Sequence, residues 1–175
     1  MRGESVDNAI AKDTLIVELE DGAVVMVKIT LTKIEESGFS PLGGIMFSGK
    51  FNADISSISP EKLKEKVKDR PVHYPGQQLP TDGWEIVDIK WQKPAVVGAI
   101  VNTSKGIFSF RVVAEATMAA RNMNYRLPSG DPIYYVAWVY KPYWRPQGRM
   151  MRLKSAERAI SYTSPSEPTY IYRVN

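Results

Sequence analysis

Apolar and polar residues alternate with a period of two along most of the chain, which predicts a protein built mainly from β-strands. The first two strands are predicted at 13–20 and 23–34, and the Asp-Gly pair at 21–22 between them is typical of a tight hairpin turn. One face of the second strand is apolar and is therefore expected to face the core; it consists of Val25, Val27, Ile29 and Leu31.

A third strand is predicted over 45–56, again from strict alternation. Its inward residues are expected to be Ile45, Phe47, Phe51, Ala53 and Ile55. Further strands are predicted at 84–91, 95–102, 107–115, 133–140 and 170–174. The strand at 133–140 is apolar on both faces, which is typical of a central strand or of one covered on each side.

Two short helices are predicted. Ser59 is expected to cap the first, with Pro60 at its first position and a helix over 62–69. Apolar residues recurring every three or four positions from Met150 to Ile160 indicate the second. The stretch 116–131 has no period and is expected to be a long loop. The prolines within 141–148 indicate that this segment does not continue as a central strand.

These elements predict a mainly β fold, with an α+β class as the alternative. We expect residues 1–12 to be a flexible N-terminal segment and residues 13–175 to form one β-rich domain. Its architecture would be a single-domain antiparallel barrel or sandwich of about eight strands with two short peripheral helices. No apolar run approaches the ~20 residues needed to cross a bilayer, and the N-terminus lacks a signal-peptide core. We therefore expect a soluble, cytoplasmic protein with no membrane contact.

The amino-acid composition excludes several classes of functional site. The 175 residues include no Cys, which excludes disulfides, thiolate metal ligands and cysteine nucleophiles. The single His excludes sites that need two imidazoles from one chain. That residue, His73, lies in an irregular loop, where we expect solvent or backbone to satisfy it. We assign no catalytic residue and no cofactor, and we expect the protein not to be an enzyme.

Positive charge is concentrated in the last third of the chain. Residues 1–118 carry 14 Lys and Arg against 16 Asp and Glu, whereas residues 119–175 carry 9 against 3. Arginine binds phosphate through a two-donor fork, and aromatic rings stack on bases. The predicted nucleic-acid-binding residues are Arg121, Arg126, Lys141, Tyr143, Trp144, Arg145, Arg149, Arg152, Lys154 and Arg158.

A simpler interpretation of the same residues is a solvated basic face above a core of aromatic side chains. Tyr134, Val136, Trp138 and Tyr140 have the spacing of one strand face and are assigned to the core. Tyr143 and Trp144 lie between two prolines and are expected to be exposed. An interface with an acidic protein is a further interpretation of this segment.

Two other hypotheses belong to different functional classes. The two-sided apolar strand at 133–140 and the C-terminal tyrosines favour a self-assembling structural subunit that forms a homo-oligomer. Alternatively, Glu85 and Asp88 could hold a divalent metal in an enzyme if a β-bulge near residues 86–87 brought them to one face. The favoured hypothesis is a binding protein that contacts DNA or RNA.

Overall fold

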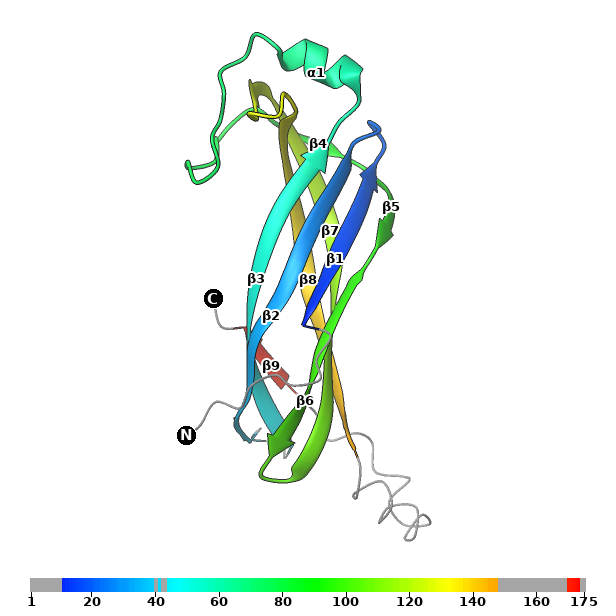
Figure 1. Ribbon diagram of the computed structural model, residues 1–175, viewed down its shortest axis with the longest axis vertical. Coiled ribbons are helices and arrows are strands. Elements are labelled where there is room, and N and C mark those ends of the chain that lie inside the picture. The colour runs from blue at the N-terminus through cyan, green and yellow to red at the C-terminus, as the bar shows by residue number, and fades with distance from the viewer. Residues whose placement is uncertain (1–10, 40, 42–43, 148–169, 174–175) are drawn as a thin grey trace.

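The computed structural model describes residues 11–39, 41, 44–147 and 170–173 (Figure 1). These residues form nine strands and one helix. The elements are β1 (Lys12–Leu19), β2 (Val24–Phe39), β3 (Ile45–Ile58), α1 (Glu61–Val67), β4 (Trp84–Val87), β5 (Ile89–Lys93), β6 (Ala95–Thr103), β7 (Gly106–Arg126), β8 (Pro132–Pro146) and β9 (Tyr170–Arg173). The molecule is elongated, with α1 at one end and the β6–β7 turn at the other.

Two sheets face each other. Sheet A has the strand order β5-β1-β2-β3-β9, in which only β9 runs parallel to its neighbour. In sheet B, β7 is central: β8 pairs along one of its edges, and β4 and β6 pair in succession along the other. Along the chain, β4 belongs to sheet B, β5 to sheet A and β6 again to sheet B. The chain therefore crosses between the two sheets twice on one side of the sandwich and connects their edges there. On the opposite side, the two sheets are bordered by β3 and β8.

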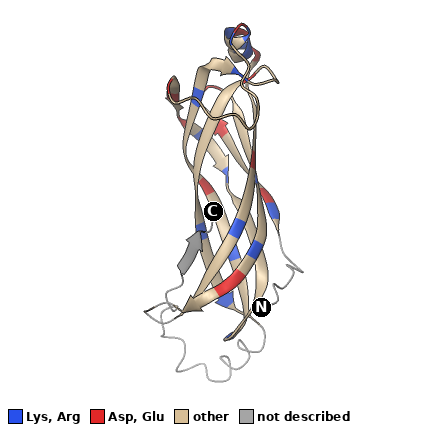
Figure 2. Ribbon diagram, turned by 90° about the vertical axis from the view of Figure 1, so that its left-hand side faces the viewer, with Lys and Arg blue, Asp and Glu red and all other residues tan. Residues whose placement is uncertain are grey.

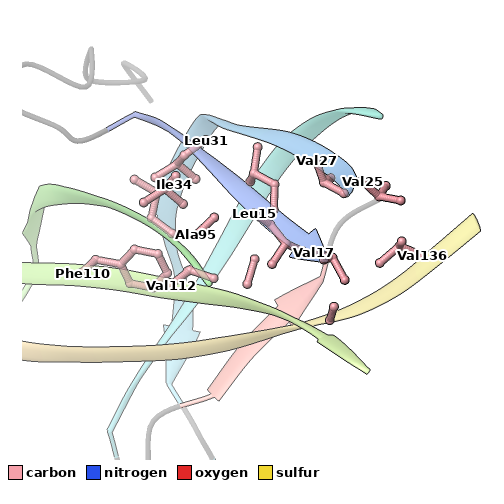
Figure 3. Close-up of a cluster of buried hydrophobic side chains, with 14 of the residues drawn as sticks. Leu15, Val17, Val25, Val27, Leu31, Ile34, Ala95, Phe110, Val112 and Val136 are labelled. Carbon is pink, nitrogen blue, oxygen red and sulfur yellow. The ribbon is translucent and has the colours of Figure 1, made fainter. Parts of the chain in front are cut away.

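The core fills the space between the two sheets. Alternate residues of β1 and β2, such as Leu15 and Val27, face Phe110 and Val112 of β7 and Val136 of β8 (Figure 3). All of these side chains are fully buried. The inward face predicted for the second strand is confirmed, since Val25, Val27, Ile29 and Leu31 are all buried. Burial of this continuous apolar layer is the main source of stability.

The predicted first hairpin is also confirmed. β1 and β2 pair in antiparallel register, with Leu15 opposite Val27. Gly22 in the turn has a φ of 87°, a conformation that side-chain-bearing residues rarely adopt. The Asp21 carboxylate accepts a hydrogen bond from the backbone N–H of Ala23, which fixes the turn locally.

The single strand predicted at 84–91 is wrong, because the chain changes sheets at Asp88. Residues 84–87 pair with β7 in sheet B, whereas residues 89–93 pair with β1 in sheet A. The carbonyl of Asp88 accepts a hydrogen bond from the backbone N–H of Glu20 at the crossing point. A change of sheet leaves the alternation of side chains almost intact, and it is therefore not visible in the sequence pattern.

The long loop predicted at 116–131 is also wrong. β7 continues to Arg126, and only residues 127–131 form a turn, with Gly130 at a φ of 90°. The register of β7 against β8 shifts between Ala116 and Met118 and again between Asn122 and Arg126. These irregularities interrupt the period of two, which explains why the pattern suggested a loop.

β8 differs from the predicted central strand, since it pairs only with β7 in the described part of the chain. It continues through Pro142 to Pro146, in agreement with the expectation that this segment cannot be central, because proline is tolerated at a sheet edge. Tyr135 and Val139 of β8 are exposed. Its two-sided apolar character therefore does not reflect burial on both faces.

The first helix is present, but Ser59 does not cap it. The capping position is Pro60, without a side-chain hydrogen bond, and the helix spans Glu61–Val67 with Leu63 and Val67 buried. Ser59 instead bonds Asp131 across the top of the sandwich. The predicted helix at 150–160 lies outside the described residues, as do residues 1–10 of the predicted N-terminal segment. Lys12, at the end of that segment, is the first residue of β1.

The orientation predicted for the third strand is confirmed: Ile45 and Phe47 face inward and are buried, whereas Ala53 and Ile55 lie on the same inner face of the sheet but are exposed to solvent. Both lie opposite core residues of β2, with Val27 paired to Ile55. They are exposed because they lie beside the side of the sandwich that no strand of the described part bridges. The fold is thus a mainly β, sandwich-like domain without a closed barrel. None of the described helical residues forms a span long and apolar enough to cross a membrane.

Candidate functional site

Arg121, the first residue of the predicted nucleic-acid surface, is neutralised within the fold. Its guanidinium lies 3.0 Å from the carboxylate of Asp21 and 3.1 Å from that of Glu85. Burial would lower the pKa of Arg121, but the hydrogen bonds to Glu85 and Asp21 raise it. Asp21 also accepts a hydrogen bond from the Tyr134 hydroxyl, 2.9 Å away. The arginine therefore anchors the β1–β2 turn to sheet B.

Three further members of the predicted surface also have partners within the fold. Arg126 donates from Nε to the carbonyl of Arg70, and Lys141 forms an ion pair with Glu115 on the neighbouring strand. Trp144 was expected to be exposed, but it packs against Phe47 and Phe110, with ring centroids 4.8 and 5.9 Å apart. It belongs to the margin of the core.

Tyr143 and Arg145 remain at the surface. They lie two residues apart on β8 and share its outer face, and Tyr143 is paired across the strands with the exposed Arg111 of β7. Figure 2 shows Lys, Arg, Asp and Glu scattered along the strands on the side that it views. Four of the predicted residues, Arg149, Arg152, Lys154 and Arg158, lie outside the described residues. Within the described part, the structure brings together Arg111, Tyr143 and Arg145 and not the whole predicted set.

The carboxylates considered for a metal site are separated by the change of sheet at Asp88. Glu85 lies in sheet B and pairs with Arg121, and the bulge at residues 86–87 that the metal-site hypothesis required is absent because β4 pairs with β7 without interruption there. No group of three or more His, Asp or Glu residues in the described part is placed to hold a metal ion. The geometry gives no support to the metal-dependent enzyme hypothesis.

His73 is buried, and its Nε2 lies 3.2 Å from the carbonyl oxygen of Gln78. The ring also makes an edge contact with Tyr125. The backbone N–H of His73 donates to the carbonyl of Arg126, which fixes the loop to the end of β7. These contacts agree with the expectation of a loop histidine satisfied by the backbone.

The outer face of sheet B is the most apolar exposed surface of the described molecule. Thirteen large apolar side chains are exposed, and alternation along the paired strands places seven of them on this face. They are Ile86, Ile100, Ile107, Met118, Tyr135, Val139 and Tyr143. The outer face of β2 and β3 in sheet A instead carries mostly polar residues, among them Lys28, Thr30, Lys50, Asn52 and Asp54. We call the seven residues the outer apolar face.

Sequence reasoning found only part of this face. Tyr135 and Val139 belong to the strand whose two-sided apolar character suggested assembly, whereas Ile86, Ile100, Ile107 and Met118 were missed. One signal was available, because the strand at 95–102 is also apolar on both faces. Comparisons of the chain with protein-family models, with curated proteins and with solved structures find no match.

Proposed function

We propose that the protein is a non-enzymatic structural subunit that assembles with copies of itself through the outer apolar face of sheet B. The observation that carries this proposal is the contrast between two outer faces, since that of β2 and β3 in sheet A is mostly polar and that of sheet B exposes seven large apolar side chains. Monomeric soluble proteins rarely expose contiguous apolar patches larger than a few hundred Å², and larger patches mark interaction sites.

A second copy is the partner that suits this face best. The Glu115–Lys141 ion pair lies within it, so these two opposite charges compensate each other without help from a partner. Away from Arg111 and Arg145, the face combines aliphatic and aromatic groups with this internally paired charge, and that part can pack against the same part of a second copy about a two-fold axis. Such symmetric contacts are the commonest in homo-oligomers.

Light scattering coupled to size-exclusion chromatography tests the proposal. The wild-type protein should elute as an oligomer, and Ile86→Lys should give a monomer because a lysine in the interface would lose its hydration. The matched control is Ile58→Lys, at the end of β3 and away from the face. The two isoleucines are similarly exposed, at 66% and 59%. A monomeric wild-type protein, or equal effects of both substitutions, would contradict self-assembly through this face.

Nucleic-acid binding remains the second candidate function, and one observation favours it. Tyr143 is exposed between Arg111, its cross-strand partner, and Arg145, two residues along β8. Neither arginine forms an ion pair with an acidic side chain of the described residues. An exposed aromatic ring flanked by two guanidinium groups can stack on a base while the arginines bind phosphates.

Salt titration of oligonucleotide binding tests this candidate. If both arginines contact phosphates, the double substitution Arg111→Ala and Arg145→Ala should flatten the dependence of log K on log salt by about 1.4 to 1.8. The control replaces two exposed lysines on the outer face of sheet A, Lys28→Ala and Lys50→Ala, and should leave the slope unchanged. An unaltered slope in the arginine variant would remove these residues from a nucleic-acid site.

A further inference from the structure

β3 and β8 border the side of the sandwich that no described strand bridges, and each has a backbone edge without a complete strand partner among the described residues. β9 pairs with β3 only along residues 46–49. Beyond this short segment, the outer edge of β3 has no strand partner among the described residues, and β8 pairs only with β7. Edge strands with unpaired N–H and C=O groups are templates for the addition of another strand.

An apolar groove lies between these two edges. Its volume is about 550 Å³, which falls within the usual range for ligand sites. Phe51 and Ile55 of β3 line one side, Trp138 and Tyr140 of β8 line the other, and Leu79 also lines the groove. The rings of Phe51 and Tyr140 stack across the seam, with centroids 4.4 Å apart. None of the described residues that line the groove is charged, so an apolar occupant suits it.

We propose that this groove binds an extended, apolar polypeptide strand, which would add to the free edge of β3 in line with β9. The pairing of β9 indicates that this edge accepts a parallel strand. A strand that continued in the same direction along β3 would run antiparallel to β8, because β8 runs antiparallel to β7 and toward the end of the molecule where β3 begins.

Three features favour a strand over a compact apolar molecule. The groove is open along two strand edges, whose backbone groups need hydrogen-bond partners that an apolar molecule cannot supply. The partly buried side chains Trp138 and Tyr140 that line it stand at alternate positions of β8, which matches the period of an added strand. The adjoining segment of β3 is already occupied by a strand. Main-chain hydrogen bonds would then give affinity, and the apolar pockets would give selectivity.

A fluorescein-labelled peptide with the sequence of residues 169–174, Thr-Tyr-Ile-Tyr-Arg-Val, is a suitable probe because it contains β9. Its binding to the full-length protein can be followed by fluorescence anisotropy. The matched peptide control carries N-methyl groups on alternate amides, which keep the side chains but remove backbone donors. The protein variants are Ile55→Lys, inside the groove, and Ile58→Lys, three residues further along the same strand and outside its lining.

We expect the unmodified peptide to bind the wild-type protein and the Ile58→Lys variant alike. Ile55→Lys should weaken binding by at least about tenfold, because the ammonium group would have to be desolvated in the groove. The N-methylated peptide should not bind. Absence of peptide binding, equal binding to both variants, or equal binding of both peptides would overturn the proposal, and the last result would identify a site for apolar small molecules instead.

The choice of substitutions separates this test from self-assembly through the outer apolar face. Tyr135 and Val139 of that face also line the groove, but Ile55 does not belong to the face and Ile86 does not line the groove. Ile55→Lys should therefore leave the oligomeric mass unchanged, whereas Ile86→Lys should leave peptide binding unchanged. Either proposal can then fail while the other stands.

Discussion

The side-chain amide of Gln92 forms two hydrogen bonds with the backbone of one residue, Ala116. The Gln92 Nε2 donates to the Ala116 carbonyl at 3.0 Å, and the Ala116 N–H donates to Gln92 Oε1 at 2.8 Å. Ala116 lies in β7 between the segments that pair with β6 and β4. No residue of β4 or β6 pairs with Ala116, because the segment between these two strands, β5, pairs with β1 in sheet A. The side-chain amide of Gln92 supplies the hydrogen bonds that a neighbouring strand would make, and it links the two sheets.

Replacement of Gln92 by leucine should therefore destabilise the fold. The variant would leave a buried N–H and a buried C=O of Ala116 without partners, at a cost of about 1–3 kcal/mol for each unsatisfied group. Urea unfolding should show a lower midpoint for Gln92→Leu. Gln78→Leu, in an exposed loop, is the control and should change the unfolding free energy by less than about 0.5 kcal/mol. Equal effects of the two substitutions would argue against this link between the sheets.

The parts of the fold that depend on local pattern could be predicted from the sequence. The first hairpin was predictable because its turn residues and its alternating strands agree. The switch at Asp88 was not, because both halves of the segment keep a strand pattern while they pair with different sheets. Likewise, the exposure of Ile55 depends on the absence of a strand opposite it, a property of the assembled sandwich and not of the local sequence.

The described members of the predicted nucleic-acid-binding set do not form one surface, for a similar reason. The charge of Arg121 is evident in the sequence, but its neutralisation depends on Asp21, which lies 100 positions earlier and reaches it only through the fold. Trp144 lies between two prolines in a segment expected to be exposed, yet it packs against Phe47 at the margin of the core. Ion pairs between residues that are distant in the sequence leave no periodic pattern in it. A count of Lys and Arg along one segment therefore overestimates the number of cationic side chains that remain unpaired at the surface.

Asp131 should make stability depend on acidity. The carboxylate is buried and accepts hydrogen bonds from the Ser59 hydroxyl, the Ser59 N–H and the Ser129 hydroxyl. Burial alone would raise the pKa of Asp131, but these hydrogen bonds and the charge of Lys64 lower it. Because the folded pKa lies below the unfolded value of about 3.9, the stabilisation is present above about pH 4. It is lost as the pH falls through the folded pKa.

Asp131→Asn should reduce the unfolding free energy at pH 7 by about 1–3 kcal/mol, since the charged acceptor is removed. It should also reduce the loss of stability between pH 4 and pH 2, measured by urea unfolding at several pH values. Some pH dependence should remain, because the pKa of Asp13 is also lowered: burial opposes the shift, but hydrogen bonds from Val96 and Thr14 outweigh it. An acid profile identical to that of the wild type would exclude Asp131 as a contributor.

The Tyr134 hydroxyl and the Arg121 guanidinium should be energetically coupled, since both bond the same carboxylate oxygen of Asp21, at 2.9 and 3.0 Å. Burial and then the hydrogen bond to Asp21 raise the pKa of Tyr134, which keeps the hydroxyl a donor at neutral pH. A double-mutant cycle of Tyr134→Phe and Arg121→Gln should give a coupling energy of about 0.5–3 kcal/mol. Additive effects of the two substitutions would show that they act separately.

The exposed ion pair between Lys90 and Glu18 provides the contrast for this cycle. Both of its side chains are more accessible to solvent than Asp21 is, so screening should limit its contribution to about 1 kcal/mol or less. Raising the salt concentration should weaken the Lys90–Glu18 coupling more than the coupling of Tyr134 to Arg121, because the first pair is more exposed and the tyrosine is neutral.

Gly98 should be intolerant of any side chain, although its backbone has no unusual conformation. A Cβ at this position would lie 2.5 Å from the carbonyl oxygen of Phe110 on the paired strand β7. Since both atoms are held by the β6–β7 ladder, Gly98→Ala should force the strands apart and destabilise the fold by about 1–3 kcal/mol. Ile100→Ala, two residues along the same exposed face, should cost less than about 1 kcal/mol. Thermal unfolding of the two variants compares them directly, and a wild-type melting temperature for Gly98→Ala would mean that β6 and β7 yield more readily than their close pairing implies.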